Sequence, residues 1–269
     1  MLGAIIGDLA GSIYEYDEFK GKDIDRRLSV LTKDNLIEKD SFYSDDTILT
    51  IAILEAILDG KDYGSTLKEY GLNYYKDEPI TNSNHFKYMF SQDFIKWCKG
   101  ERPGNSMGNG ALMRVSPVGY LFNDFNKISL ETVKATRVSH DNPLAIDFAK
   151  VLTSIIYFGR KGYDKEEVKW LFYSKPMDLD KVRLCQDFDS TCMVFDKCVA
   201  ALFESNSFEE ALRLAVSLGG DTDTVGAITG SMAEAYYDIP FELRNKALAK
   251  LPDKFLAKLD LGYQRIKKL

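Results

Sequence analysis

The sequence has few cysteines, only two histidines and no long apolar run. No pair among its four cysteines, Cys98, Cys185, Cys192 and Cys198, has CxxC spacing, which argues against a disulfide scaffold. We expect reduced, mostly buried thiols in a cytoplasmic protein. No stretch approaches the roughly 20 apolar residues that span a bilayer, and Asp8 interrupts the apolar start too early for a signal peptide. From these absences we expect a protein that is neither secreted nor inserted in a membrane.

Positive charge is not concentrated anywhere in the chain. There are 35 lysines and arginines against 41 acidic residues, a net charge of −6, and the pI is about 5.2. This balance argues against a surface that binds nucleic acid or anionic lipid through phosphate charge, so we expect a small molecule or another protein as partner. The 269 residues are 45% hydrophobic and contain no linker and no internal repeat. They predict a single domain over 1–269.

Apolar residues follow helical spacing almost throughout. From Ile48 to Leu58 the chain is apolar nearly all round, which predicts a buried helix. Ser207 followed by Glu210 is a capping box that begins an amphipathic helix. Alternating strand patterns are scarce, so we predict an all-α fold, with the polar stretch 16–41 as a long surface loop. Further helices are predicted over about 64–76, 84–98, 129–138, 143–160, 164–173, 187–204, 222–236 and 240–250.

Small residues and two acids interrupt the first apolar segment, GDLAGSIYE at 7–15. Each glycine weakens a helix by roughly 1 kcal/mol relative to alanine, so its use here indicates that something approaches this backbone closely. A neighbouring helix packed through small residues would explain the pattern as well as a ligand would.

Two acidic segments each precede an apolar helix: SDDT at 44–47 and GGDTDT at 219–224. Acidic helix caps would explain both, but one cap needs only one acid, and adjacent carboxylates repel each other unless a cation or proton intervenes. The ligands offered are all oxygens, which suit Mg²⁺, Mn²⁺ or Ca²⁺ rather than zinc, and the spacing is not that of an EF-hand. If the two segments converge, a bound cation, or two, would neutralise them.

A glycine-rich stretch, SMGNGALMR at 106–114, could present backbone amides to an anion, although a plain turn explains it equally well and there is no Walker lysine. His140 lies in SHDNP at 139–143. A lone histidine is more often a structural hydrogen-bonding residue than a catalyst. His85 has no supporting context.

Taken together, and in this order, the segments GDLAGSIYE, SDDT, SMGNGALMR, SHDNP and GGDTDTVGAITG resemble the ADP-ribosylglycohydrolase family. They span positions 7 to 230. The resemblance implies a compact orthogonal bundle of many helices with a binuclear Mg²⁺ or Mn²⁺ centre, which hydrolyses the glycosidic bond at C1″ of an ADP-ribosyl group. It also implies ADP-ribose or an ADP-ribosylated protein or small molecule as the partner.

Residue by residue, the resemblance assigns one metal to Ser44, Asp45, Asp46 and Asp223, and the other to Asp221, Asp223 and Thr224, with Asp223 bridging. It places the diphosphate and ribose on Ser106, Gly108, Asn109, Gly110 and His140. Glu15 or Asp46 would transfer the proton. Met107 stands where some relatives carry an aromatic residue, so the adenine-stacking partner is not identified by sequence.

The leaving group is the least determined part of the substrate. An acidic rim around Glu15, Asp17 and Glu18 would attract a guanidinium, which slightly favours an arginine linkage. The segment GSIYE at 11–15 also resembles the branch that cleaves serine-linked ADP-ribose, where the glutamate serves the metal site instead, and O-acetyl-ADP-ribose is a third possibility. Two other functions are kept as alternatives: a non-catalytic ADP-ribose-binding protein of the same fold, and a metal-dependent phosphohydrolase that acts on the diphosphate.

Overall fold

The computed structural model describes residues 1–14, 24–75, 89–173, 175–184 and 191–269. Within these residues there is no β-strand, and the isolated bridge between Asn105 and His140 is the sole strand-like pairing. The all-α prediction is therefore confirmed. The helices are α1 Leu2–Gly11, α2 Ile24–Leu28, α3 Asp45–Asp59, α4 Tyr63–Tyr74, α5 Gln92–Cys98, α6 Ser116–Leu121, α7 Phe125–Arg137, α8 Pro143–Arg160, α9 Lys165–Phe172, α10 Leu179–Leu184, α11 Thr191–Phe203, α12 Phe208–Ser217, α13 Thr222–Ala233, α14 Phe241–Leu248 and α15 Asp253–Ile266, with 3₁₀ turns η1 Ser12–Tyr14, η2 Ser29–Leu31 and η3 Asn109–Ala111.

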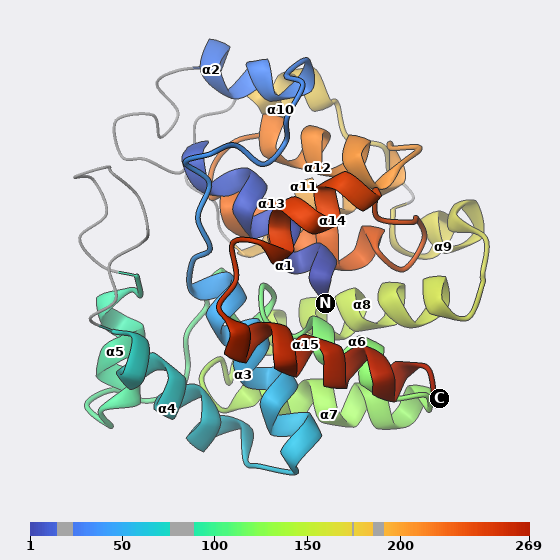
Figure 1. The fold of residues 1–269 in the computed structure, drawn as a ribbon. Helices are drawn as coiled ribbons and strands as arrows, with labels where there is room; N and C mark the ends of the chain where they lie inside the picture. Colours follow the sequence, from blue (N-terminus) through green and yellow to red (C-terminus); the bar gives the residue numbers. More distant parts are fainter. Residues whose placement is uncertain (15–23, 76–88, 174, 185–190) are drawn as a thin grey trace.

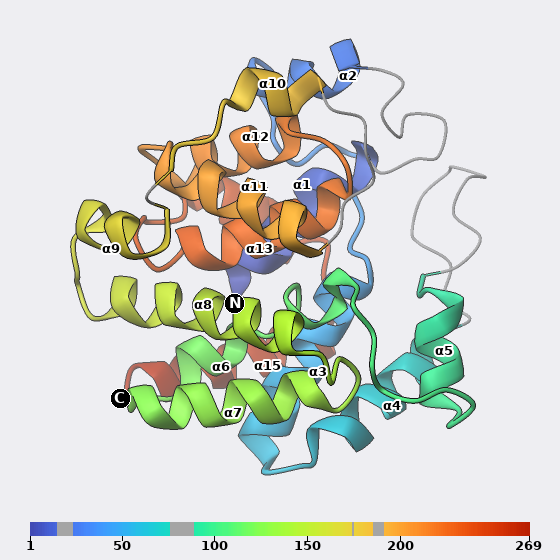
Figure 2. The same ribbon diagram turned by 180° about the vertical axis from the view of Figure 1, so that it is seen from behind.

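The helices form two groups around one hydrophobic core. Helices α1, α11, α12 and α13 lie together in one half of the molecule, and α3, α6, α7 and α15 lie in the other (Figures 1 and 2). Buried apolar side chains run without interruption from one group to the other. None of the helices in the described part of the chain is both long enough and apolar enough to cross a membrane.

Most predicted helices are present, with shifted ends. The helix predicted over 143–160 has those bounds, and the Ser207 side chain caps α12 by accepting from the Glu210 amide at 3.1 Å. The helix predicted over 84–98 begins only at Gln92, and residues 84–88 lie outside the described part. The prediction of one surface loop over 16–41 is wrong for 24–31, where α2 and η2 bury Arg27 and Val30.

Helices α1 and α13 cross at a contact made by glycines. A Cβ atom added to Gly7 would lie 1.9 Å from the carbonyl oxygen of Gly226, and one added to Gly226 would lie 2.3 Å from the carbonyl oxygen of Gly7. Gly3 and Gly230 form the same contact one turn away, and Gly11 packs on Thr222. The glycines of α1 therefore face a neighbouring helix, the packing alternative that the sequence had left open. At these positions the backbones of α1 and α13 lie so close together that no methyl group fits between them.

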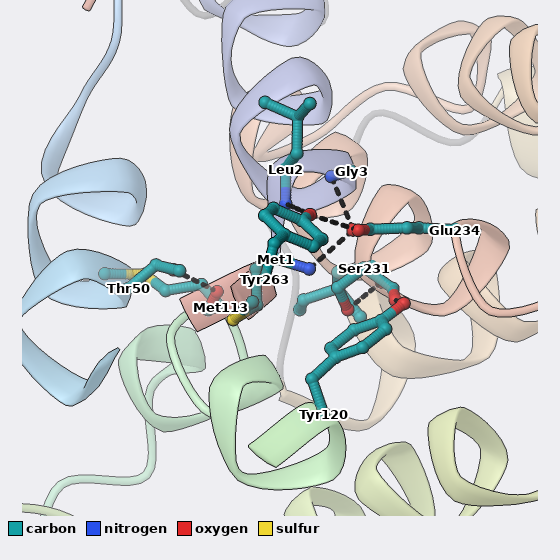
Figure 3. Close-up of polar contacts among 10 residues, drawn as sticks. Met1, Leu2, Gly3, Thr50, Met113, Tyr120, Ser231, Glu234 and Tyr263 are labelled. Carbon is teal, nitrogen blue, oxygen red and sulfur yellow. Dashed lines mark hydrogen bonds and ion pairs between the residues drawn. The ribbon is translucent and has the colours of Figure 1, made fainter. Parts of the chain in front are cut away.

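The C-terminal end of α13 is held by polar contacts from three helices (Figure 3). Glu234 accepts a hydrogen bond from the Gly3 amide at 2.7 Å and another from the Tyr263 hydroxyl of α15. The Tyr120 hydroxyl of α6 donates to the carbonyl oxygen of Ser231 at 2.8 Å. Buried charge and carbonyl groups are thus satisfied, and the orientation of α13 is fixed.

We expect Gly7→Ala to lower the free energy of unfolding by about 3 kcal/mol, the upper part of the range for overpacked cores, because its methyl group meets backbone that cannot rotate away. Gly64→Ala in α4 is the matched control. Its Cβ would lie 3.3 Å from a side-chain oxygen of Asp62, and helix propensity favours alanine, so little or no loss is expected. Urea unfolding of both variants measures the difference. Equal stabilities would show that the crossing tolerates a side chain.

Candidate active site

Asp8 of α1 holds the beginning of α3. Its fully buried carboxylate accepts hydrogen bonds from the Ser44 amide at 2.9 Å, the Thr47 amide at 3.1 Å and the Thr47 hydroxyl at 2.5 Å. Burial raises the pKa of Asp8 to about 6, while these hydrogen bonds act in the opposite direction. Sequence analysis gave Asp8 no role in the site. The structure makes it the residue that orients SDDT.

The hydroxyl of Ser44, and not a carboxylate, caps α3. It accepts from the Asp46 amide at 3.2 Å and contacts Asp46 Oδ2 at 3.3 Å. Asp45 and Asp46 follow it in the first turn of the helix. An acidic cap therefore does not account for either aspartate, although both are favourably placed in the helix dipole.

The GGDTDT segment reaches the same place from the other half of the molecule. Gly219 and Gly220 have φ values of 72° and 83°, a backbone path that glycine adopts without strain. Asp221 stands at the N-cap of α13 but makes no side-chain capping bond, and its Oδ2 accepts from Asn109 Nδ2 at 3.2 Å. The alternative of a second acidic cap is therefore wrong for Asp221.

Thr224 connects the two acidic segments directly. Its hydroxyl donates to Asp46 Oδ2 at 3.3 Å, across 178 positions of sequence. Asp223, which is 5% exposed, accepts from the Thr224 amide at 2.8 Å. The convergence of SDDT and GGDTDT that the sequence left conditional is thus confirmed by the structure.

Burial and neighbouring carboxylates raise the pKa values of Asp45 and Asp46 at this junction. Burial, followed by the charges of Asp8 and Asp221, raises the pKa of Asp45 to about 8. Burial and the same neighbours, with Asp45, place the pKa of Asp46 well above its usual range. The two motifs contain no basic residue, but the fold brings in Arg114, whose charge partly offsets the effect on Asp45. A group of this kind gains stability from a cation or a proton.

The chemistry of the side chains at this junction fits a hard divalent cation. The donor atoms are carboxylate, hydroxyl and amide oxygens, and the buried Oδ1 atoms of Asp46 and Asn109 have no hydrogen-bond partner within the described structure. However, no three Asp, Glu, His or Cys side chains in the described ranges converge closely enough to enclose one ion. The binuclear centre therefore stays a prediction.

A cavity of about 830 Å³ opens beside the carboxylates, a size typical of pockets for small ligands. Its lining residues include three groups: the acidic end, made by the two acidic motifs; the floor, made by the 106–110 segment and His140; and the apolar wall, made by apolar side chains between 89 and 97. The residues of these three regions that line it include Asp45, Asp46, Asp221, Asp223, Thr224, Ser106, Gly108, Asn109, Gly110, His140, Met89, Phe90, Phe94 and Trp97. All predicted site residues except Ser44 and Glu15 thus line one cavity. Ser44 is buried behind Asp46, and Glu15 lies outside the described residues.

Not every backbone amide of the 106–110 segment is free to bind an anion. The Gly108 amide donates to Ser106 Oγ at 3.1 Å, so it is not available to an anion. The amides at the start of η3, Asn109 and Gly110, are those that a helical turn leaves without internal partners. Behind the segment, the Thr50 hydroxyl of α3 donates to the carbonyl oxygen of Met113 at 3.3 Å (Figure 3). This bond joins the 106–114 stretch to α3, the helix that carries Asp46.

Backbone pairing brings His140 to the 106–110 segment. Asn105 and His140 form the isolated bridge, and the Ser106 amide donates to the carbonyl oxygen of Ser139 at 3.1 Å. The ring of His140 is 4% exposed, and burial together with the charge of Arg114 lowers the pKa of His140 to about 3. The imidazole is therefore neutral at physiological pH.

Three contributors to the site were not predicted from the sequence: Asp8, Arg114 and the apolar wall of the cavity. Arg114 is part of the quoted SMGNGALMR segment, but nothing in its spacing indicates that it is 1% exposed and beside the site. The apolar wall contains Phe90 and Phe94, whose rings stack with centroids 5.3 Å apart. Met107, in contrast, is 62% exposed and is not among the lining residues.

Known proteins resemble this chain over nearly its whole length. It is 26% identical over 267 residues to the ADP-ribosylarginine hydrolase Tri1 of Pseudomonas putida (strain GB-1), covering 89% of this chain and 70% of that protein. It is 22% identical over 311 residues to the human ADP-ribosylhydrolase ARH3, with 88% and 84% covered. A solved "ADP-ribosylglycohydrolase-related protein complex" shares the fold, with a TM-score of 0.66 at 20% identity over 98% of this chain and 93% of the other.

The sequence pattern of a whole family gives the same answer as these individual relatives. The pattern described as ADP-ribosylglycohydrolase matches residues 1–268, essentially the entire chain. Four of the five motifs that carry the resemblance, SDDT, SMGNGALMR, SHDNP and GGDTDTVGAITG, contribute residues to the cavity lining. The chain therefore belongs to the ADP-ribosylglycohydrolase family and is an enzyme of the hydrolase class.

Proposed function

We propose that this enzyme is a metal-dependent ADP-ribosyl hydrolase that cleaves the C1″ glycosidic bond of mono-ADP-ribosylated substrates and releases ADP-ribose. The observation that supports this most directly is the contact between Thr224 and Asp46, which joins two acidic segments at one end of a ligand-sized cavity. The family supports the reaction class. The metal, the linkage and the residue roles are part of the proposal.

In this proposal the acidic end of the cavity receives the distal ribose. Two Mg²⁺ or Mn²⁺ ions, when bound by Ser44, Asp45, Asp46, Asp221, Asp223 and Thr224, supply Lewis acidity and lower the pKa of a bound water. Asp46 or Glu15 accepts or delivers the proton as the C1″ bond breaks. The surrounding carboxylates stabilise the positive charge that develops on the ribose in the transition state.

The rest of the cavity fits the remainder of ADP-ribose. We assign the diphosphate to the amides at the start of η3 and to His140, because these are the neutral donors on the floor of the cavity. The adenine is assigned to the apolar wall, where half-buried Phe94 presents an aromatic ring already stacked on Phe90. Base stacking on such a ring stabilises binding without requiring a specific hydrogen bond.

We expect Gly108→Val to weaken ADP-ribose binding and leave metal affinity largely unchanged. Among the described residues only Ser106 Oγ, at 3.5 Å, lies near a Cβ built on Gly108, and the glycine has a φ of −77°, so we expect the fold to accommodate the side chain and the valine to occupy space in the cavity. Calorimetry with ADP-ribose and with Mg²⁺ measures the two affinities. A folded variant with unchanged ADP-ribose affinity would remove this segment from the binding site.

The most detailed part of the proposal is the preference for one acceptor linkage. Arginine is slightly favoured because one relative is named for ADP-ribosylarginine hydrolysis, although the acidic segment with Glu15, Asp17 and Glu18 lies outside the described residues. ADP-ribosylated arginine, ADP-ribosylated serine and O-acetyl-ADP-ribose should each be incubated with and without Mg²⁺, and the products identified by mass spectrometry. Free ADP-ribose from the arginine substrate supports the proposal.

Other products would identify the alternatives. Release of AMP would assign the protein as a phosphohydrolase of the diphosphate. Tight binding of ADP-ribose without turnover of any substrate would assign a non-catalytic binding role. Faster hydrolysis of the serine or acetyl ester linkage would overturn the arginine preference and retain the reaction class.

A further inference from the structure

A buried hydrogen-bond chain connects Arg114 to His140. Arg114 Nη2 donates to Ser139 Oγ at 2.5 Å, and Ser139 Oγ lies 2.8 Å from His140 Nδ1. All three residues are less than 5% exposed. The sequence brings Ser139 and His140 together as neighbours, but Arg114 comes from a different segment of the chain.

The direction of each hydrogen bond follows from the chemistry of the groups. A guanidinium has donors only, so Ser139 Oγ must be the acceptor from Arg114. The Ser139 hydroxyl has one hydrogen, and His140 Nδ1 is its one acceptor within the described structure. If Nδ1 carried the proton instead, the Ser139 hydrogen would be buried without an acceptor, which costs free energy. The satisfied arrangement has Ser139 donating to an unprotonated Nδ1.

The other edge of the ring faces the cavity floor. A Cβ built on Gly110 would lie 3.2 Å from His140 Cε1 and 3.3 Å from His140 Nε2, and both residues line the cavity. A neutral imidazole carries one proton, so an unprotonated Nδ1 leaves the hydrogen on Nε2. The ring then offers a donor at the point where the 106–110 segment passes it.

We propose that Arg114 is a positioning residue that acts through Ser139 to hold His140 as the Nε2–H tautomer, so that the ring donates a hydrogen bond to an oxygen of the bound ligand. The low pKa of His140 agrees with this arrangement, because a neutral ring is the form that can be fixed in one tautomer. That the ligand oxygen belongs to ADP-ribose rests on the proposed function. The assignment of the tautomer is independent of the proposed function.

Nitrogen-15 NMR of the histidine rings in the full chain tests the tautomer without any ligand. The chain has only two histidines, so His85→Gln leaves the single ring of His140. In that background we expect one species with the proton on Nε2. Ser139→Ala should produce a mixture or the Nδ1–H form, and Ser139→Thr, which keeps the hydroxyl, should restore the original spectrum. Arg114→Met provides a second route, because it removes the donor that fixes the hydroxyl.

Binding measurements extend the same test to the ligand. We expect Ser139→Ala to weaken ADP-ribose binding about five- to tenfold, the effect of one neutral hydrogen bond, and Ser139→Thr to recover most of it. An Nδ1–H ring in the otherwise unaltered protein, or an unchanged spectrum in both Ser139→Ala and Arg114→Met, would overturn the inference. A single Nε2–H species in a protein that neither binds nor hydrolyses ADP-ribosyl compounds would support the relay and contradict the proposed function.

Discussion

Asp223→Asn should reduce kcat/KM by at least about 100-fold. Residues that merely support metal ligands already cost about 10- to 100-fold when mutated, and Asp223 is proposed to bridge two ions. Steady-state hydrolysis of the preferred substrate, at saturating Mg²⁺, measures the loss. The variant should remain folded, because the amide oxygen of asparagine can still accept the 2.8 Å bond from the Thr224 amide.

Asp164→Asn is the matched control for this variant. Asp164 begins α9 and accepts from the Glu166 amide at 2.8 Å, an ordinary cap on a distant part of the surface. Asparagine caps helices nearly as well as aspartate, so activity should be unchanged and stability lowered by less than about 1 kcal/mol. Comparable turnover in two folded variants would mean that Asp223 is not a metal ligand.

Exhaustive chelation should abolish turnover, and Mg²⁺ or Mn²⁺ should restore it. The charge of Asp221 raises the pKa values of Asp45 and Asp46, and Asp45 further raises that of Asp46, so removing a bound cation leaves Asp45 and Asp46 either protonated or repelled by their neighbours. Turnover is measured after dialysis against EDTA and again after each metal is added back. Full activity in the chelated enzyme would contradict the binuclear mechanism.

Thermal unfolding gives an independent measure of the same site. A ligand that binds only the folded protein stabilises it by about 2.7 kcal/mol when present at 100 times its Kd. Added Mg²⁺ should therefore raise the Tm of the chelated protein, and the increase should be much smaller in Asp223→Asn. An equal increase in both proteins would place the bound ion elsewhere.

Much of the fold and the acidic end of the site could be predicted from the chain itself. Buried helices have a strong periodic signal, and the second aspartate of SDDT exceeds what a helix cap requires. Polar residues that contribute through tertiary contacts have no such signal. Asp8 and Arg114 are single residues in apolar surroundings, and their roles depend on which segment the fold places beside them.

Two further features depended on information that is absent from local spacing. The pairing between Asn105 and His140 is one bridge long, too short to leave an alternating pattern, yet it brings together two segments that line the cavity. The apolar wall of the cavity could not be chosen from 31 Tyr and Phe residues and two Trp, because only tertiary packing places Phe94 in the cavity. Local pattern thus predicted which acidic segments converge, but not the shape of the pocket beside them.

The glycine crossing of α1 and α13 has a consequence for how this enzyme can be re-engineered. Asp8 is on one of these helices, and Asp223 and Thr224 are on the other, so the catalytic end inherits its geometry from two backbones that admit no side chain between them. The apolar wall of the cavity belongs to α5 and the residues just before it, which take no part in the glycine crossing. A mutant library aimed at new substrates can therefore diversify the exposed positions beside Phe94, such as Gln92 and Asp93, whereas Gly3, Gly7, Gly11, Gly226 and Gly230 must be held constant for the two helices to keep their packing.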